Sequence, residues 1–145
     1  MASLERAIQI AAMAHAGQVD KAGETYILHP IRVMLRMQTQ EERIAAVLHD
    51  VVEDSEYTLA DLAAEGFSAE ILAALDALTK RPGESRIEAA HRAAADPLAR
   101  RVKLADNAEN MDLSRIPEPT AKDHARLQAY EDVRAILLAA ERTVV

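Results

Sequence analysis

The expected fold follows from one stretch, Ala46-Val47-Leu48-His49-Asp50-Val51-Val52-Glu53-Asp54, in which an apolar helical pattern runs into four polar side chains. Upstream of it, Thr39 is followed three residues later by Glu42, the pattern of a capping box at a helix N-terminus. Apolar residues then recur at helical spacing from Ile44 to Val51. The stretch therefore predicts an amphipathic helix that begins after Thr39 and carries the His-Asp pair near its end.

The sequence on either side predicts further helices. N-capping residues, a proline at a first helical position and glycines just past apolar runs mark their ends. We expect helices over Leu4–Ala16, Pro30–Met37, Thr58–Gly66, Ser68–Leu78, Arg86–Ala95, Asp96–Met111 and Thr120–Glu141. No stretch alternates with period two for long, as half-buried strands do. The expected fold class is all-α, a bundle of short and medium helices in a single domain over residues 1–145.

The composition excludes several classes of protein. The chain has 145 residues and no cysteine, which excludes disulfides, iron–sulfur clusters and thiolate zinc sites. Its net charge of −7 argues against a protein that coats nucleic acid. No segment has the roughly 20 apolar residues of a membrane span, and the N-terminus lacks the pattern of a signal peptide. We therefore expect no nucleic-acid or membrane partner and a cytoplasmic location.

Four residues stand out as candidate metal ligands. His49 and Asp50 are adjacent, His29 precedes a proline at a helix start, and Asp106 lies in an otherwise apolar helical pattern. Two imidazoles and two carboxylates suit a borderline divalent cation such as Mn²⁺, Fe²⁺, Co²⁺ or Zn²⁺. A His-Asp pair also arises by chance, and a buried Asp106 needs only some partner, which Lys103 or Asn110 could supply instead of a metal.

Glu53 and Asp54 add two more acids to this part of the chain. If the helix continues past Asp50, His49 and Glu53 share a face, and a carboxylate there could accept a proton from water. The alternative is a solvated helix end. Acids are unfavourable at a helix C-terminus, however, and a bound cation would relieve that cost.

Five strings, in this order, cover most of the chain: His15-Ala16-Gly17-Gln18 with Lys21-Ala22-Gly23; Tyr26-Ile27-Leu28-His29-Pro30; the stretch over residues 46–54; Leu78-Thr79-Lys80-Arg81; and Val102-Lys103-Leu104-Ala105-Asp106. Together they resemble the HD-domain metal-dependent phosphohydrolases. The closer resemblance is to the hydrolase domain of Rel/SpoT-type alarmone enzymes and to the stand-alone small alarmone hydrolases. That resemblance implies hydrolysis of the 3′-pyrophosphate of guanosine 3′,5′-bis(diphosphate), ppGpp, with release of pyrophosphate.

The resemblance also implies roles for individual residues. The four metal ligands are matched by His29, His49, Asp50 and Asp106, with Mn²⁺ the usual ion and other divalent cations possible. The acidic pair that positions and activates water is matched by Glu53 and Asp54. Contacts to the nucleotide are matched by Lys21, Asn110, Arg126 and Tyr130. The alternatives for these last residues are a loop cation for Lys21, a helix-end polar group for Asn110 and a core position for Tyr130.

Two positions depart from the family's pattern. Asp20 stands where a basic residue usually packs on the guanine, and Asn107 replaces a common basic residue after the last metal ligand. A carboxylate cannot replace that basic residue, which leaves recognition of the base open. One alternative is therefore the same chemistry on another phosphorylated nucleotide, such as a dinucleotide phosphate. The other is a helical module that binds a nucleotide without catalysis.

Overall fold

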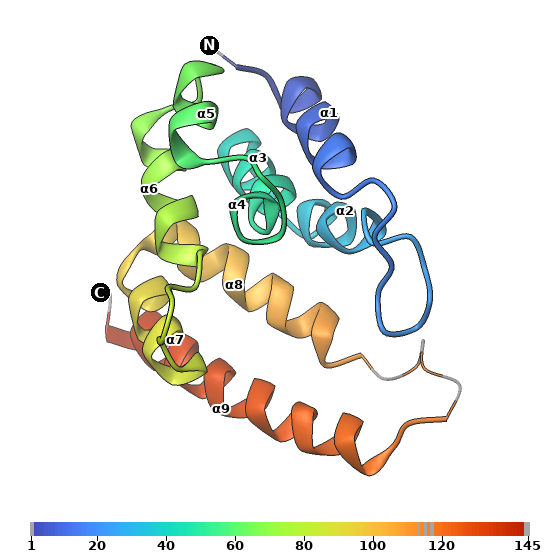
Figure 1. The fold of residues 1–145 in the computed structure, drawn as a ribbon. Helices are drawn as coiled ribbons and strands as arrows, with labels where there is room; N and C mark the ends of the chain where they lie inside the picture. Colours follow the sequence, from blue (N-terminus) through green and yellow to red (C-terminus); the bar gives the residue numbers. More distant parts are fainter. Residues whose placement is uncertain (1, 113, 115, 117, 144–145) are drawn as a thin grey trace.

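The computed structural model describes residues 2–112, 114, 116 and 118–143, and within them the backbone forms nine helices and no strand (Figure 1). The helices are α1 (Leu4–Ala14), α2 (Leu28–Leu35), α3 (Gln40–Leu48), α4 (Val51–Asp54), α5 (Leu59–Ala64), α6 (Ala69–Leu78), α7 (Arg86–Ala95), α8 (Pro97–Asn110) and α9 (Ala121–Thr143). The predicted all-α class is confirmed. No helix in this described part is long and apolar enough to span a membrane.

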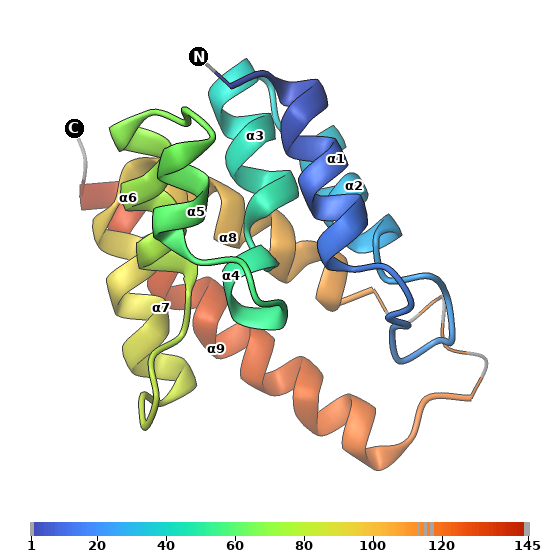
Figure 2. The same cartoon turned by 45° about the horizontal axis from the view of Figure 1, so that its top comes forward.

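Helix α8 is the centre of the bundle. It packs against α2, α3, α6, α7 and α9, with α1–α3 on one side and α7 and α9 on the other (Figures 1 and 2). Its apolar residues Val102 and Ala105 pack with Val33 of α2 and Ala46 of α3. Polar side chains on α8 are therefore surrounded by neighbouring helices rather than by water.

Each of the buried polar groups on α8 has a partner, as burial of such groups requires. The guanidinium of Arg100 pairs with Glu141 of α9 at 3.1 Å. The side-chain amide of Asn107 donates to the backbone carbonyl of Tyr130, also on α9, at 2.7 Å. Asn107, which stands where the resembled family commonly has a basic residue, thus holds α9 against α8.

Most predicted helix starts are confirmed by the cap that begins each helix. Reciprocal capping boxes join Thr39 to Glu42 and Thr58 to Asp61, and Asp96 caps α8 by accepting from the Ala99 amide. The boundaries otherwise differ by a few residues: α1 ends at Ala14, α2 begins at Leu28 and α9 extends to Thr143. Such caps depend on hydrogen bonds within four residues, so the local sequence determines them.

The helix expected from Thr39 through Val51 is interrupted at the His-Asp pair. Helix α3 ends at Leu48 and a separate single turn, α4, begins at Val51. The carbonyl of Ala46 accepts hydrogen bonds from both the amide of His49, at 3.3 Å, and its ring Nδ1, at 2.6 Å. This tightened turn ends α3, so the helix does not continue unbroken past Asp50, the condition set above for a shared face of His49 and Glu53. Both residues nevertheless line one pocket.

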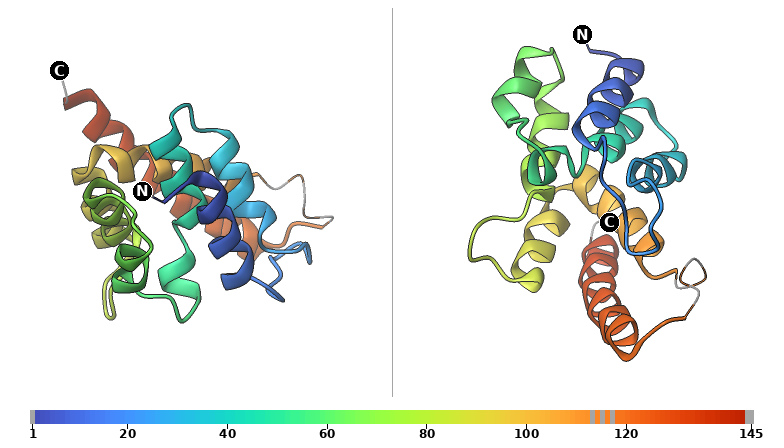
Figure 3. Two further views of the ribbon diagram at one scale, coloured as in Figure 1. Left: turned by 90° about the horizontal axis from the view of Figure 1, so that it is seen from above. Right: turned by 45° about the vertical axis from the view of Figure 1, so that its right-hand side comes forward.

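The long loop from residue 15 to residue 27 returns alongside the C-terminal end of α8 (Figure 3). Gly17 enters it with a φ of 82°, the left-handed conformation predicted for a glycine after a helix. A single antiparallel bridge between Val19 and Thr25 closes the loop on itself. The loop thereby brings its own side chains near Asn110, at the end of α8.

Candidate functional site

The four predicted ligands meet at one point. His29 comes from α2, His49 and Asp50 from the turn between α3 and α4, and Asp106 from α8. Oδ1 of Asp106 lies 2.8 Å from Nε2 of His29 and 3.3 Å from Nε2 of His49. Nε2 of His49 is also 3.1 Å from Oδ2 of Asp50. Both histidines and Asp106 are buried, at 5% exposure or less, so this contact is a core feature.

The donor set fits a divalent cation. One ligand atom from each of His29, His49 and Asp50 lies within 4.8 Å of the other two. Nδ1 of His49 lies 2.6 Å from the Ala46 carbonyl, to which it donates, which fixes the tautomer and turns Nε2 toward the carboxylates. Imidazole nitrogen with carboxylate oxygen suits first-row divalent ions. The cluster is therefore a candidate metal centre.

The charged side chains of the cluster compensate one another. Burial alone would lower the pKa of His49, but the carboxylates of Asp50 and Asp106 outweigh it and raise that pKa well above its usual value. Burial would raise the pKa of Asp50, but His49 lowers it to about 2. Burial would also raise the pKa of Asp106, but Lys103 and His49 outweigh it and hold that pKa well below its usual value. Two buried carboxylates thus stay ionised and require positive charge beside them.

Asp106 is also held from its own helix. Its Oδ2 accepts from Nζ of Lys103 at 3.0 Å, and its Oδ1 accepts from the side-chain amide of Asn110 at 3.2 Å. The carboxylate of Asp106 raises the pKa of Lys103, so the lysine remains protonated. Lys103 and Asn110, the partners of Asp106 that the sequence left as alternatives to a metal, therefore both contact it.

A second group of side chains supports Asp50, and the sequence analysis missed it. The hydroxyl of Tyr26 donates to Oδ2 of Asp50, and the ring of His15 lies 4.9 Å from that of Tyr26. Nδ1 of His15 is bonded to Oε1 of Gln18 at 2.9 Å. Burial lowers the pKa of His15, which keeps the ring neutral. The three-residue spacing of His15 and Gln18 within the first matching string was the available signal.

The two candidate catalytic acids lie on the rim. Glu53 and Asp54 are both exposed, on the single turn of α4. Oε1 of Glu53 accepts the backbone N–H of Lys80 at 3.0 Å, which ties α4 to the loop after α6. Partial burial of its carboxylate, with the charges of Asp50 and Glu53, raises the pKa of Asp54 to about 6. A carboxylate with such a pKa is suited to accept a proton near neutral pH.

We expect the raised pKa of Asp54 to be measurable in cation-free protein. Its side-chain carboxyl carbon, followed by NMR, should titrate with a midpoint near 6, above the ordinary aspartate value. Because Glu53 contributes to the shift, Glu53→Gln should move the midpoint to lower pH. Replacement of the exposed Glu56, whose charge is not among the main causes of the raised pKa, is the control and should leave the midpoint in place. A midpoint near 4 in the unsubstituted protein would contradict this assignment.

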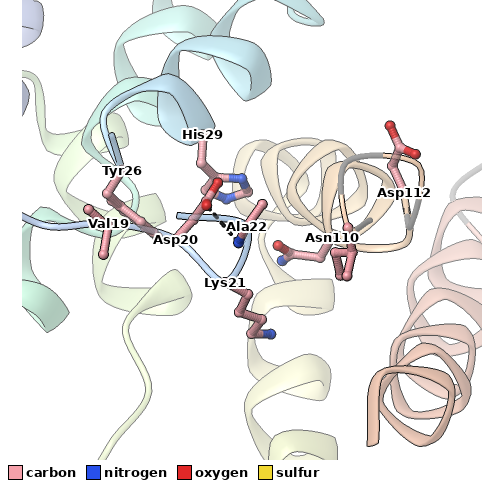
Figure 4. Close-up of a pocket in the computed structure, with 9 residues that line it drawn as sticks. Val19, Asp20, Lys21, Ala22, Tyr26, His29, Asn110 and Asp112 are labelled. Atoms are coloured by element: carbon pink, nitrogen blue, oxygen red, sulfur yellow. Dashed lines mark hydrogen bonds between the residues drawn. The ribbon is translucent and has the colours of Figure 1, made fainter. Parts of the chain in front are cut away.

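Two cavities flank the cluster. The first, which we call the loop pocket, has a volume of about 300 Å³ and is lined by His29, Tyr26, Lys21 and Asn110, among others (Figure 4). The second, which we call the cationic pocket, has a volume of about 180 Å³. Its lining includes His49, Asp50, Glu53, Lys80, Arg86, Lys103 and Tyr130. The candidate metal centre therefore separates a larger pocket on the loop side from a smaller one lined by three cations.

The residues expected to contact a nucleotide do not all lie in one pocket. Lys21 and Asn110 line the loop pocket, whereas Tyr130 lines the cationic pocket. The Tyr130 hydroxyl accepts from Nζ of Lys21 at 3.2 Å, which links the two. Arg126 is not among the described residues that line either pocket and pairs with Asp123 at 3.4 Å.

Asp20 has a local structural role that the sequence analysis did not assign. One carboxylate oxygen of Asp20 accepts from the backbone amide of Ala22 at 2.9 Å (Figure 4). The same oxygen accepts from the backbone amide of Glu24, also at 2.9 Å. Such bonds are typical of aspartate in turns. The side chain thus closes its own loop at the edge of the loop pocket, and the position carries no cation for a base to stack on.

Comparison with known proteins agrees with this geometry, although no family model matches the chain. It is 36% identical over 121 residues to a GTP pyrophosphokinase of Streptomyces coelicolor, an alignment of 74% of this chain and 14% of that protein. It is 39% identical over 82 residues to a guanosine-3′,5′-bis(diphosphate) 3′-pyrophosphohydrolase of Borreliella burgdorferi, covering 54% and 12% respectively. A solved structure of a metazoan ortholog of SpoT superposes with a TM-score of 0.73 at 21% identity, over 100% of this chain and 98% of that one. The chain is a Rel/SpoT-type HD domain. This domain spans about a seventh of the length of the first of these relatives.

Proposed function

We propose that this Rel/SpoT-type domain hydrolyses ppGpp at its 3′-pyrophosphate with a divalent cation, Mn²⁺ in the first instance. The observation that carries the proposal is the meeting of His29, His49, Asp50 and Asp106 between two pockets. Relatives named for this reaction, with sequence identity to this chain, support it. The superposition over the whole chain supports a single domain over residues 1–145, for which we propose a cytoplasmic location.

The reaction balances with water alone. Water attacks the phosphorus bonded to the ribose O3′, the P–O3′ bond breaks, and O3′ takes up a proton, which gives GDP and pyrophosphate. A divalent cation held by the four ligands would supply Lewis acidity to the phosphoryl oxygens and to water. Asp54, whose pKa is raised to about 6, is the proposed proton acceptor, and Glu53 holds the neighbouring position on α4.

The loop pocket is the proposed site of the nucleoside. It is the larger cavity and combines apolar side chains such as Val19 and Ala22 with the polar groups of Lys21 and Asn110. Lys21 is proposed to pair with a phosphate and Asn110 to bond the sugar. Tyr130 and Arg126, both on α9, complete the proposed contacts when the nucleotide is bound.

The test is a hydrolysis assay on purified, metal-stripped protein with Mn²⁺ added back. We expect ppGpp to be converted to equimolar GDP and pyrophosphate, and a chelator to abolish the conversion. A panel of other phosphorylated nucleotides, including a dinucleotide phosphate, is assayed in parallel for phosphate and pyrophosphate separately. Turnover of another nucleotide with ppGpp untouched would contradict the substrate. Stoichiometric cation binding with no turnover of any nucleotide would show a binding module instead.

A further inference from the structure

The cationic pocket is lined by three cations, Lys80, Arg86 and Lys103, and by two acids, Asp50 and Glu53. Lys103 is paired with Asp106 at 3.0 Å, so its charge is largely compensated. Lys80 and Arg86 also line the pocket, and neither side chain forms an ion pair within the part of the chain that the structure describes. Most arginines elsewhere in that part are paired with a carboxylate. Two cations that line one cavity beside the metal centre without a direct ion pair indicate an anionic ligand.

The side chain of Arg86 is oriented by an aromatic ring. Its guanidinium carbon lies 5.2 Å from the centre of the Tyr130 ring, the geometry of a cation–π contact. A guanidinium stacked by its face keeps its N–H groups at the edge available, and these bind phosphate oxygens in pairs. Arg86 is thus pre-oriented for a phosphoryl group and loses little side-chain entropy on binding one.

The loop that carries Lys80 is fixed in place from two sides. The backbone N–H of Lys80 donates to Oε1 of Glu53 at 3.0 Å, next to the metal centre. Arg92 of α7 donates to the carbonyl of Thr79 at 2.7 Å and pairs with Glu84 at 2.6 Å. The backbone of Lys80 is therefore fixed beside the metal centre, and its exposed side chain lines the same small pocket as His49 and Asp50.

We propose that the cationic pocket binds the pyrophosphoryl group of the substrate, and then the pyrophosphate product, through Lys80 and Arg86. This inference rests on the proposed function, because ppGpp divides at the O3′–phosphorus bond into a nucleoside part and a pyrophosphoryl part. The metal centre lies between the two pockets, so the substrate spans it, with the nucleoside in the loop pocket and the pyrophosphoryl group in the cationic pocket. Water supplies the oxygen atom that leaves with pyrophosphate.

The test compares Arg86→Gln and Lys80→Gln with the unsubstituted protein and with Arg134→Gln, an exposed arginine of α9 that lines neither pocket. The first measurement is the inhibition constant of pyrophosphate at fixed free Mn²⁺, beside that of GDP. We expect Arg86→Gln and Lys80→Gln each to raise the inhibition constant of pyrophosphate about tenfold, the effect of losing a charge-assisted hydrogen bond. The inhibition constant of GDP should change less than about twofold. Arg86→Lys should recover part of the loss.

The second measurement does not depend on turnover. Sodium pyrophosphate is titrated into metal-stripped protein and followed by NMR at the Arg86 and Lys80 signals. We expect saturable shifts that Arg86→Gln weakens and Arg134→Gln does not. If ppGpp is hydrolysed but both variants bind pyrophosphate normally, the subsite is wrong and the function stands. If the variants weaken the binding of GDP instead, the pocket holds the 5′-diphosphate and the proposal is overturned. If ppGpp is not hydrolysed, the proposed function fails, and the titration alone decides whether pyrophosphate binds.

Discussion

Asp106→Asn is expected to abolish cation binding and to reduce ppGpp hydrolysis about 10²- to 10³-fold, the scale of losing one group that stabilises transition-state charge. Asp106 contacts both histidines and Lys103, which lines the cationic pocket, so its charge acts on several groups of the centre at once. The amide has nearly the shape of the carboxylate but no charge. Its loss therefore leaves Lys103 and His49 without their shared counterion.

The measurement is metal content after Mn²⁺ loading, beside initial rates of pyrophosphate release. Since the loss of a buried counterion can also destabilise the fold, thermal unfolding is followed by circular dichroism, and Asp50→Ala serves as a second variant at a less buried ligand. The control is Asp132→Asn, an exposed aspartate on α9 whose partner is Gln128. A folded Asp106→Asn protein that retains one equivalent of Mn²⁺ and normal turnover would remove Asp106 from the centre.

The features that the sequence predicted best are those that depend on neighbouring residues. Thr39, Thr58 and Asp96 begin their helices as expected because each cap closes hydrogen bonds within four residues. The four candidate ligands were singled out as residue types that are costly to bury unless they are paired, and the packing of α8 against α2 and α3 brings them together. Their role as metal ligands stays a prediction.

The features that the sequence did not predict depend on side chains from several helices. The break between α3 and α4 coincides with the bond between His49 and the Ala46 carbonyl, which the apolar periodicity does not reveal. The pairing of Tyr26 with Asp50 joins two strings that are separate in the sequence. The cationic pocket likewise needs α7 and α9 in contact before Arg86 meets Tyr130, so no local pattern indicates it.

Glu53→Gln and Asp54→Asn are each expected to lower turnover by about 10²- to 10⁴-fold, the usual contribution of a positioned general base, while the cation stays bound. Neither carboxylate belongs to the buried cluster, and both lie on the single turn of α4 beside it. Mn²⁺ content, measured as above, should therefore equal that of the unsubstituted protein. Glu56→Gln, two residues further along the same exposed segment, is the matched control and should keep full activity.

The pH dependence of kcat distinguishes the two acids. If Asp54 accepts the proton, the rate in the unsubstituted enzyme rises with pH as this carboxyl ionises, with a midpoint at or below the value of about 6 expected without a cation, because bound positive charge lowers the pKa. Asp54→Asn should remove this rise. In Glu53→Gln, loss of the neighbouring negative charge should shift the remaining rise to lower pH. If the rise persists in Asp54→Asn and disappears in Glu53→Gln, the two acids exchange roles, and Glu53, held at 3.0 Å by the Lys80 amide, becomes the base.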